Sequence, residues 1–191
     1  EGYSLCEILD EELPPDLDRF CNLFEQVAEG VAFAHDNGVV HRDLKPGNIM
    51  IVRNDDDKEI VKLVDFGLAK VMDATVSQKI TQTGEIFGSP LYMSPEQCLG
   101  QTISATSDIY SLGCVMFEYL TNEGPFAGDT VFNTMHRHIT MEAPDLPVEL
   151  NLPKELENMI KKCLAKKAED RYASVRDIIP VLASLRNTSS V

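Results

Sequence analysis

Four polar side chains between residues 43 and 65 have the types and spacing that phosphate chemistry requires. Asp43, Lys45 and Asn48 lie in one short loop sequence, and Asp65 follows 17 positions after Asn48. A carboxylate can accept a proton from a hydroxyl group, and a lysine is a point charge suited to a transferring phosphate. Amide and carboxylate oxygens are the hard ligands that Mg²⁺ takes beside phosphate oxygens. The set therefore indicates phosphoryl transfer.

The ordinary interpretation of each residue alone is different. An isolated loop aspartate such as Asp43 or Asp65 most often closes an Asx-turn, and a lone lysine such as Lys45 is most often a solvated surface residue. Only the combination favours the chemical interpretation.

A small hairpin is the element that must bring these residues together. Residues 49–52 and 60–64 are short strand-forming runs, and the charged turn 54–58 separates them. Pairing of the two runs places the loop 41–48, which precedes the first strand, beside Asp65, which follows the second.

Helices make up most of the rest, so the fold class is predicted to be mainly α. Asp16 is the expected N-cap of a helix whose apolar residues recur at steps of three and four, and Gly38 suits the position that ends it. A central helix, apolar nearly all round, is expected from a cap at Thr106 or Ser107 to about Leu120. The other predicted helices cover residues 130–138, 154–164 and 175–185. Residues 65–96 show no helical period, which is typical of a long functional loop.

Composition narrows the function classes. Seventeen basic and 31 acidic residues give a net charge of −14. Binding to a nucleic-acid backbone requires clustered cations, so we expect no nucleic-acid partner. The five cysteines have no CxxC spacing, which favours a reducing compartment and a cytoplasmic location. The longest mostly apolar stretch, residues 109–120, is too short to cross a bilayer, so no membrane segment is expected in these residues.

Four local sequences and a downstream pair then occur in a recognisable order. They are His41-Arg-Asp-Leu-Lys-Pro-Gly-Asn48, Asp65-Phe-Gly67, Gly88-Ser-Pro-Leu-Tyr-Met-Ser-Pro-Glu96, Asp108-Ile-Tyr-Ser-Leu-Gly113 and Asp170-Arg171. In this order they resemble the C-terminal lobe of a protein kinase of the Hanks type. The resemblance implies a helical kinase lobe with a small β-hairpin and a long activation segment, over residues 1–187, with 188–191 as a tail.

The resemblance implies a role for each residue of the set. Asp43, with Lys45 beside it, would be catalytic, orienting the substrate hydroxyl and accepting its proton. Asn48 and Asp65 would hold Mg²⁺ and the phosphates of ATP, and Met50 would form an apolar floor under the adenine. ATP and Mg²⁺ are thus the expected cofactors.

Two further groups of residues receive roles from the same resemblance. Arg42 would sense a phosphate on the activation segment, with Thr81 and Thr83 as the expected phosphorylation sites, ahead of Thr75 and Ser77. A Ser/Thr-rich loop that is merely flexible is the alternative.

The structural residues would be Glu96 and Arg171, as a buried ion pair, and Asp108, as the anchor of the catalytic-loop backbone. A surface pair is the alternative for Glu96 and Arg171. His41 and Phe66 resemble a packing stack rather than catalytic groups.

The acceptor class follows from the same motifs. Lys45 within Asp-Leu-Lys-Pro-x-Asn resembles serine/threonine kinases, which implies protein substrates with Ser or Thr acceptors, and the run 81–97 resembles bacterial members. A small-molecule phosphotransferase and a non-catalytic interaction module are the two alternatives. Ser89 replaces the usual threonine, and Tyr110 stands where many kinases have tryptophan.

The family's N-terminal lobe is not found in the sequence. No GxGxxG occurs, and the first lysine is Lys45, so the family's phosphate-binding lysine is not among these residues. We expect the sequence to be truncated before Glu1, the chain alone to bind Mg-ATP weakly and transfer phosphate poorly, and its exposed upper surface to be apolar and to favour dimerisation.

Overall fold

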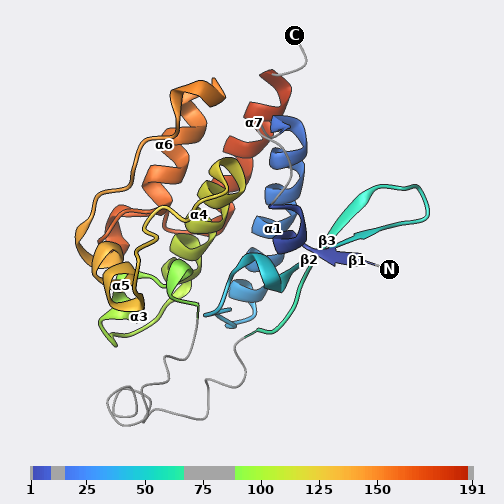
Figure 1. Cartoon of the computed structure of the whole chain (residues 1–191). Helices are drawn as coiled ribbons and strands as arrows, with labels where there is room; N and C mark the ends of the chain where they lie inside the picture. The colour runs from blue at the N-terminus through green and yellow to red at the C-terminus, as the bar shows by residue number, and fades with distance from the viewer. Residues whose placement is uncertain (1, 10–15, 67–88, 189–191) are drawn as a thin grey trace.

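The computed structural model describes residues 2–9, 16–66 and 89–188. Helices form the body of the described part, and a small sheet lies at one side of it (Figure 1). The prediction of a mainly helical lobe with a small hairpin is therefore confirmed.

The sheet has three antiparallel strands in the order β1-β2-β3: β1 Gly2–Ser4, β2 Ile49–Arg53 and β3 Glu59–Leu63. The hairpin of β2 and β3 was expected, whereas β1 was not. Its register sets Tyr3 opposite Ile51, a pairing across 48 positions that no local pattern reports. Asn54 closes the hairpin turn, since its side-chain oxygen accepts hydrogen bonds from the N–H groups of Asp56 and Lys58.

Helix α1, Leu17–Asp36, begins and ends where the sequence predicts. The Asp16 side chain accepts hydrogen bonds from the N–H groups of Asp18 and Arg19. At the other end Gly38 takes a φ of +73°, the left-handed conformation that stops a helix. One face of α1 is buried, and its Phe24 ring meets Tyr119, from the central helix, edge-on at 5.6 Å between centroids.

Helix α4, Ala105–Thr121, is the buried centre of the lobe, with 13 of its 17 residues buried. The expected cap at Thr106 or Ser107 is wrong, because Ser104 precedes the first helical residue. Ser107 is the third residue of the helix, where its hydroxyl accepts the Ser104 N–H at 3.2 Å and donates to the Glu96 carboxylate at 2.6 Å.

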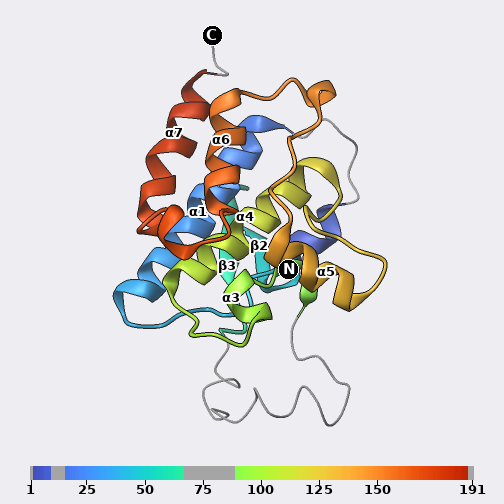
Figure 2. The same cartoon turned by 90° about the vertical axis from the view of Figure 1, so that its left-hand side faces the viewer.

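The remaining helices enclose α4, and α7 lies beside α1 (Figures 1 and 2). They are α3 Pro95–Cys98, α5 Val131–Thr140, α6 Lys154–Cys163 and α7 Ile179–Thr188. Short 3₁₀ turns occupy Leu5–Ile8, Pro46–Asn48, Pro90–Tyr92, Val148–Leu150, Ala168–Asp170 and Val175–Ile178.

The helix predicted over 175–185 is thus divided. Its first turn is 3₁₀, and the α-helix starts at Ile179. Pro180 explains the division, because it has no N–H to donate to the carbonyl of Arg176 in a continuous α-helix. None of the helices in the described ranges is long and apolar enough to cross a membrane.

Candidate active site

The loop between α1 and β2 brings three of the predicted residues into direct contact. Lys45 Nζ lies 2.9 Å from Asp43 Oδ2. The buried Asn48 amide donates from Nδ2 to the Asp43 backbone oxygen at 2.8 Å, and Nδ2 is also 3.5 Å from Asp43 Oδ2. The Asp43 and Lys45 side chains are 23% and 29% exposed, so both remain reachable by a substrate.

Asp65 is brought alongside this loop by the backbone of the hairpin. The backbone N–H of Val64 donates to the Asn48 backbone oxygen at 3.0 Å, and His41 Nε2 lies 3.1 Å from the Val64 backbone oxygen. The His41 and Phe66 rings pack at 4.6 Å between centroids. Asp65 itself is exposed and has a φ of +55°, an uncommon conformation outside glycine. The described contacts include none between its carboxylate and the Asp43 or Asn48 side chain.

Asp108 holds the start of the same loop from the central helix. Its carboxylate accepts hydrogen bonds from the backbone N–H of His41 and of Arg42, each at 2.8 Å. His35 Nε2, from the end of α1, lies 2.7 Å from the same carboxylate. The carboxylate is 1% exposed, so three donors offset the cost of burying it.

His35 was not found from the sequence. It lies six residues before His41, and nothing in its local pattern separates it from an ordinary helix-terminal histidine. Burial lowers the pKa of the neighbouring His41, although Asp108 acts in the opposite direction. His41 therefore packs as a neutral ring, which agrees with its contact with Phe66.

Arg42 is held in a strained conformation at the centre of these contacts, with a φ of +67°. Its carbonyl accepts a hydrogen bond from Gln97 Nε2 at 2.9 Å. Its Nε is buried and has no hydrogen-bond partner within the part of the chain that the structure describes. Thr81 and Thr83, the residues expected to bear the phosphate that Arg42 senses, lie outside the described residues, as do Thr75 and Ser77.

Glu96 and Arg171 form a two-pronged ion pair, with Nη1–Oε1 at 2.8 Å and Nη2–Oε2 at 2.9 Å. The Arg171 side chain is fully buried and also donates to three backbone oxygens. Burial alone would raise the pKa of Glu96, but the hydrogen bonds from Arg171 and Ser107 lower it to about 2. The pair thus fixes α3, and with it the segment that leads to the site.

Comparison with known proteins identifies the family of the chain. The model of the protein kinase domain matches residues 1–180. The chain belongs to the protein kinase family.

Curated proteins similar to the chain include serine/threonine-protein kinases of bacteria. A probable serine/threonine-protein kinase of Clostridium acetobutylicum is 38% identical over 188 residues, which is 97% of this chain and 27% of that protein. The serine/threonine-protein kinases PknB of Mycolicibacterium smegmatis and Mycobacterium tuberculosis are each 35% identical, over 93% and 98% of this chain. The chain spans between a quarter and a third of the length of these relatives. The resemblance to bacterial members is confirmed.

The residues of this kinase lobe fit a metal–nucleotide site by the chemistry of their donors. The Asn48 side-chain nitrogen donates to Asp43, which leaves the side-chain oxygen Oδ1 available as a ligand. Asp65 supplies an exposed carboxylate. The described residues contain no cluster of three or more His, Cys, Asp or Glu side chains that could enclose a metal. Mg²⁺ in nucleotide sites takes one or two protein ligands and completes its shell with phosphates and water.

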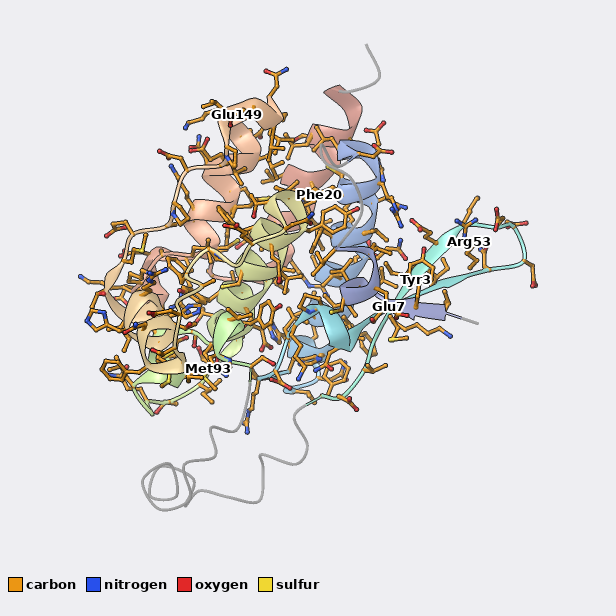
Figure 3. The ribbon with its side chains drawn as sticks, in the orientation of Figure 1. Tyr3, Glu7, Phe20, Arg53, Met93 and Glu149 are labelled. Carbon is orange, nitrogen blue, oxygen red and sulfur yellow. The ribbon has the colours of Figure 1, made fainter. Side chains whose placement is uncertain are left out.

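Met50 lies on the sheet face opposite the buried core. Ile49 and Ile51 are buried, while Met50 between them is half-buried on the other face. A cavity of about 730 Å³ lies elsewhere, between α1 and the hairpin near Tyr3 and Arg53. Figure 3 shows both of these residues on the hairpin side, far from Met93 beside the catalytic loop. Charged groups paired with one another line it, Arg19 with Glu59 and Arg53 with Asp57.

Proposed function

We propose that the chain carries the catalytic machinery of a protein kinase that transfers the γ-phosphate of ATP to serine or threonine hydroxyls of proteins. One observation carries the proposal: the Asp43 carboxylate is held 2.9 Å from the Lys45 ammonium by a loop whose backbone Asn48 and Asp108 fix. A base and a cation held side by side are what transfer to a hydroxyl requires.

In the proposed reaction the acceptor hydroxyl approaches the Asp43 carboxylate. The hydroxyl oxygen forms a bond to the γ-phosphorus, the bond from that phosphorus to the bridging oxygen breaks, and ADP leaves with its electron pair. The hydroxyl proton passes to Asp43, a step worth about 10²- to 10⁴-fold in rate for general bases. Lys45 stabilises the negative charge on the transferring group.

Asn48 and Asp65 are the residues proposed to hold Mg²⁺, which when bound would neutralise charge on the phosphates. Met50 is proposed to contact the adenine through its half-buried face. The acceptor would lie over the turn Pro90–Tyr92, since Met93 and Tyr92 line a small cavity shared with Asp43.

Regulation by phosphorylation of Thr81 or Thr83 is part of the proposal. Arg42 has a buried Nε with no partner among the described residues, and a phosphate can take one to three charge-assisted hydrogen bonds. Mapping of phosphorylated residues after incubation with Mg-ATP tests this. Phosphate found only outside residues 75–83 would exclude Thr81 and Thr83.

The test of the function is a comparison of acceptors with the gene product that carries this chain. We expect phosphate transfer from Mg-ATP to Ser- or Thr-containing peptides, and a loss of at least about 10²-fold on Asp43→Asn. Asp55→Asn, in the exposed hairpin turn, is the matched control and should retain activity. Transfer to small molecules but not peptides would favour a small-molecule phosphotransferase, and no transfer to either would favour an interaction module.

A further inference from the structure

Gln97 is the residue through which the segment before the central helix contacts the catalytic loop. It lies in α3, directly after Glu96. Its side-chain Nε2 donates to the Arg42 backbone oxygen at 2.9 Å, 55 positions away in the chain. Its Oε1 accepts from the Ser94 backbone N–H, also at 2.9 Å. One amide group therefore joins the two segments.

The peptide that Gln97 holds is the one that aims Asp43. The Arg42 carbonyl and the Asp43 N–H belong to the same peptide plane. On the other side of Arg42, its own N–H donates to Asp108 at 2.8 Å. Arg42 has a φ of +67°, which a non-glycine residue keeps only when its surroundings impose it. Asp108 and Gln97 impose it from the two ends.

The anchor of Gln97 is firm. Ser94 is fully buried, and its hydroxyl accepts the Gln97 N–H at 3.3 Å, so the two residues cap α3 reciprocally. Glu96, the preceding residue, is tied to the buried Arg171. A shift of the Ser94–Glu96 segment would therefore be transmitted to the Arg42–Asp43 peptide through the Gln97 side chain.

We propose that Gln97 is a positioning residue, which fixes the Arg42–Asp43 peptide and so couples the acceptor-side segment to the orientation of Asp43. The proposal deepens the proposed function and rests on it. An amide is the group suited to this role, because it supplies a donor at one end and an acceptor at the other. A carboxylate retains only the acceptor, and a methionine of similar length supplies neither an amide donor nor a carboxamide oxygen.

Glu and Met variants separate positioning from simple capping of α3. In Gln97→Glu the Ser94 N–H keeps its acceptor while the Arg42 oxygen loses its donor. Hydrogen exchange should remain slow at Ser94 and become about 2- to 10-fold faster at Asp43, because the peptide loses the hydrogen bond on its oxygen and keeps only the long one from the Asp43 N–H to His41 Nδ1 at 3.4 Å. In Gln97→Met exchange should accelerate at both. Gln101→Glu, the same change at an exposed glutamine four residues later, should alter neither.

The kinetic readout uses the gene product with a Ser/Thr peptide and Mg-ATP. We expect Gln97→Glu and Gln97→Met to lower kcat about 10- to 100-fold, since a misplaced base loses rate rather than affinity, while the KM for Mg-ATP stays within about twofold. Gln101→Glu should match the unaltered protein.

Two results would overturn the proposal. Unchanged exchange at Asp43 together with unchanged kcat in Gln97→Glu would reduce Gln97 to a cap of α3. A rise in KM for Mg-ATP with kcat preserved would place its effect on nucleotide binding instead. If the unaltered protein transfers no phosphate, the proposed function fails, and exchange at Asp43 still decides whether Gln97 holds the loop.

Discussion

The Asp108 carboxylate of the central helix accepts a hydrogen bond from the backbone N–H of Arg42 at 2.8 Å, across 66 positions of the chain. The contact joins the most buried helix of the lobe to the loop that carries Asp43. The orientation of the proposed base is thus set by the hydrophobic core and not by the loop alone.

Replacement of Asp108 tests this connection. In Asp108→Asn the side chain retains one oxygen for the two backbone N–H groups, so a buried donor loses its acceptor. We expect a loss of about 1–3 kcal/mol in the free energy of unfolding, measured by urea denaturation. Asp36→Asn, which removes an exposed ion pair with Arg176, is the control and should change stability by under about 1 kcal/mol. Equal effects of the two variants would argue against the anchor.

The pKa of Glu96 predicts how stability depends on pH. This carboxyl has a pKa of about 2 in the folded chain, below its ordinary value of 4.5. A lowered pKa means that the unfolded chain binds more protons, so this stabilisation is present above about pH 4.5 and is lost as pH falls towards 2. From the difference between the two pKa values, the contribution of Glu96 to the free energy of unfolding is about 3 kcal/mol at neutral pH.

Glu96→Gln should therefore lower the free energy of unfolding by about 3–5 kcal/mol at pH 7, because Arg171 stays buried without its counter-charge. Urea titrations at several pH values between 2 and 7 measure both effects. The variant should show a flatter stability profile between pH 4.5 and 2. A profile parallel to that of the unaltered chain would mean that Glu96 is not the group responsible.

Gly113 lies where α4 packs against the C-terminal end of α6. A Cβ added there would lie 2.8 Å from Cys163 Cβ and 3.1 Å from Leu164 Cδ2. Gly113→Ala should destabilise the chain by about 1–3 kcal/mol through overpacking, as measured by thermal or urea unfolding. Gly124→Ala is the matched control, since its added Cβ meets nothing nearer than 3.6 Å. A neutral Gly113→Ala would show that the two helices can separate at little cost.

The local parts of the fold could be predicted because their causes are local. Asp16 and Gly38 bound α1 through contacts within a few residues of each helix end. The catalytic loop could be recognised because Asp43, Lys45 and Asn48 are close in sequence as well as in space.

The rest depends on contacts that no short window contains. Strand β1 pairs with β2 across about 48 positions, and the Ser107 hydroxyl donates to Glu96, eleven residues away. His35 and Gln97 were missed for the same reason. Each acquires its role from a partner, Asp108 or Arg42, that only the folded chain brings near.

The sequence also predicts how this chain behaves without the motifs that it lacks. No glycine-rich phosphate loop occurs in its 191 residues, and no lysine precedes Lys45. We expect the chain by itself to bind Mg-ATP weakly and to transfer phosphate slowly, because the phosphates would lack the contacts of that loop and that lysine. Calorimetric titration with Mg-ATP measures this, and efficient phosphorylation by the chain alone, abolished by Asp43→Asn, would contradict it.

In the proposed function, Asn48 and Asp65 bind one metal ion beside Asp43. Binding of Mn²⁺ and ATP to the gene product, followed by paramagnetic broadening of backbone amide signals, tests it most directly. We predict broadening centred on Asp43, Asn48 and Asp65, with the hairpin turn at Asp55 unaffected, and a loss of broadening at Asn48 in Asp65→Asn. Broadening centred elsewhere, or unchanged at Asn48 in that variant, would contradict the account.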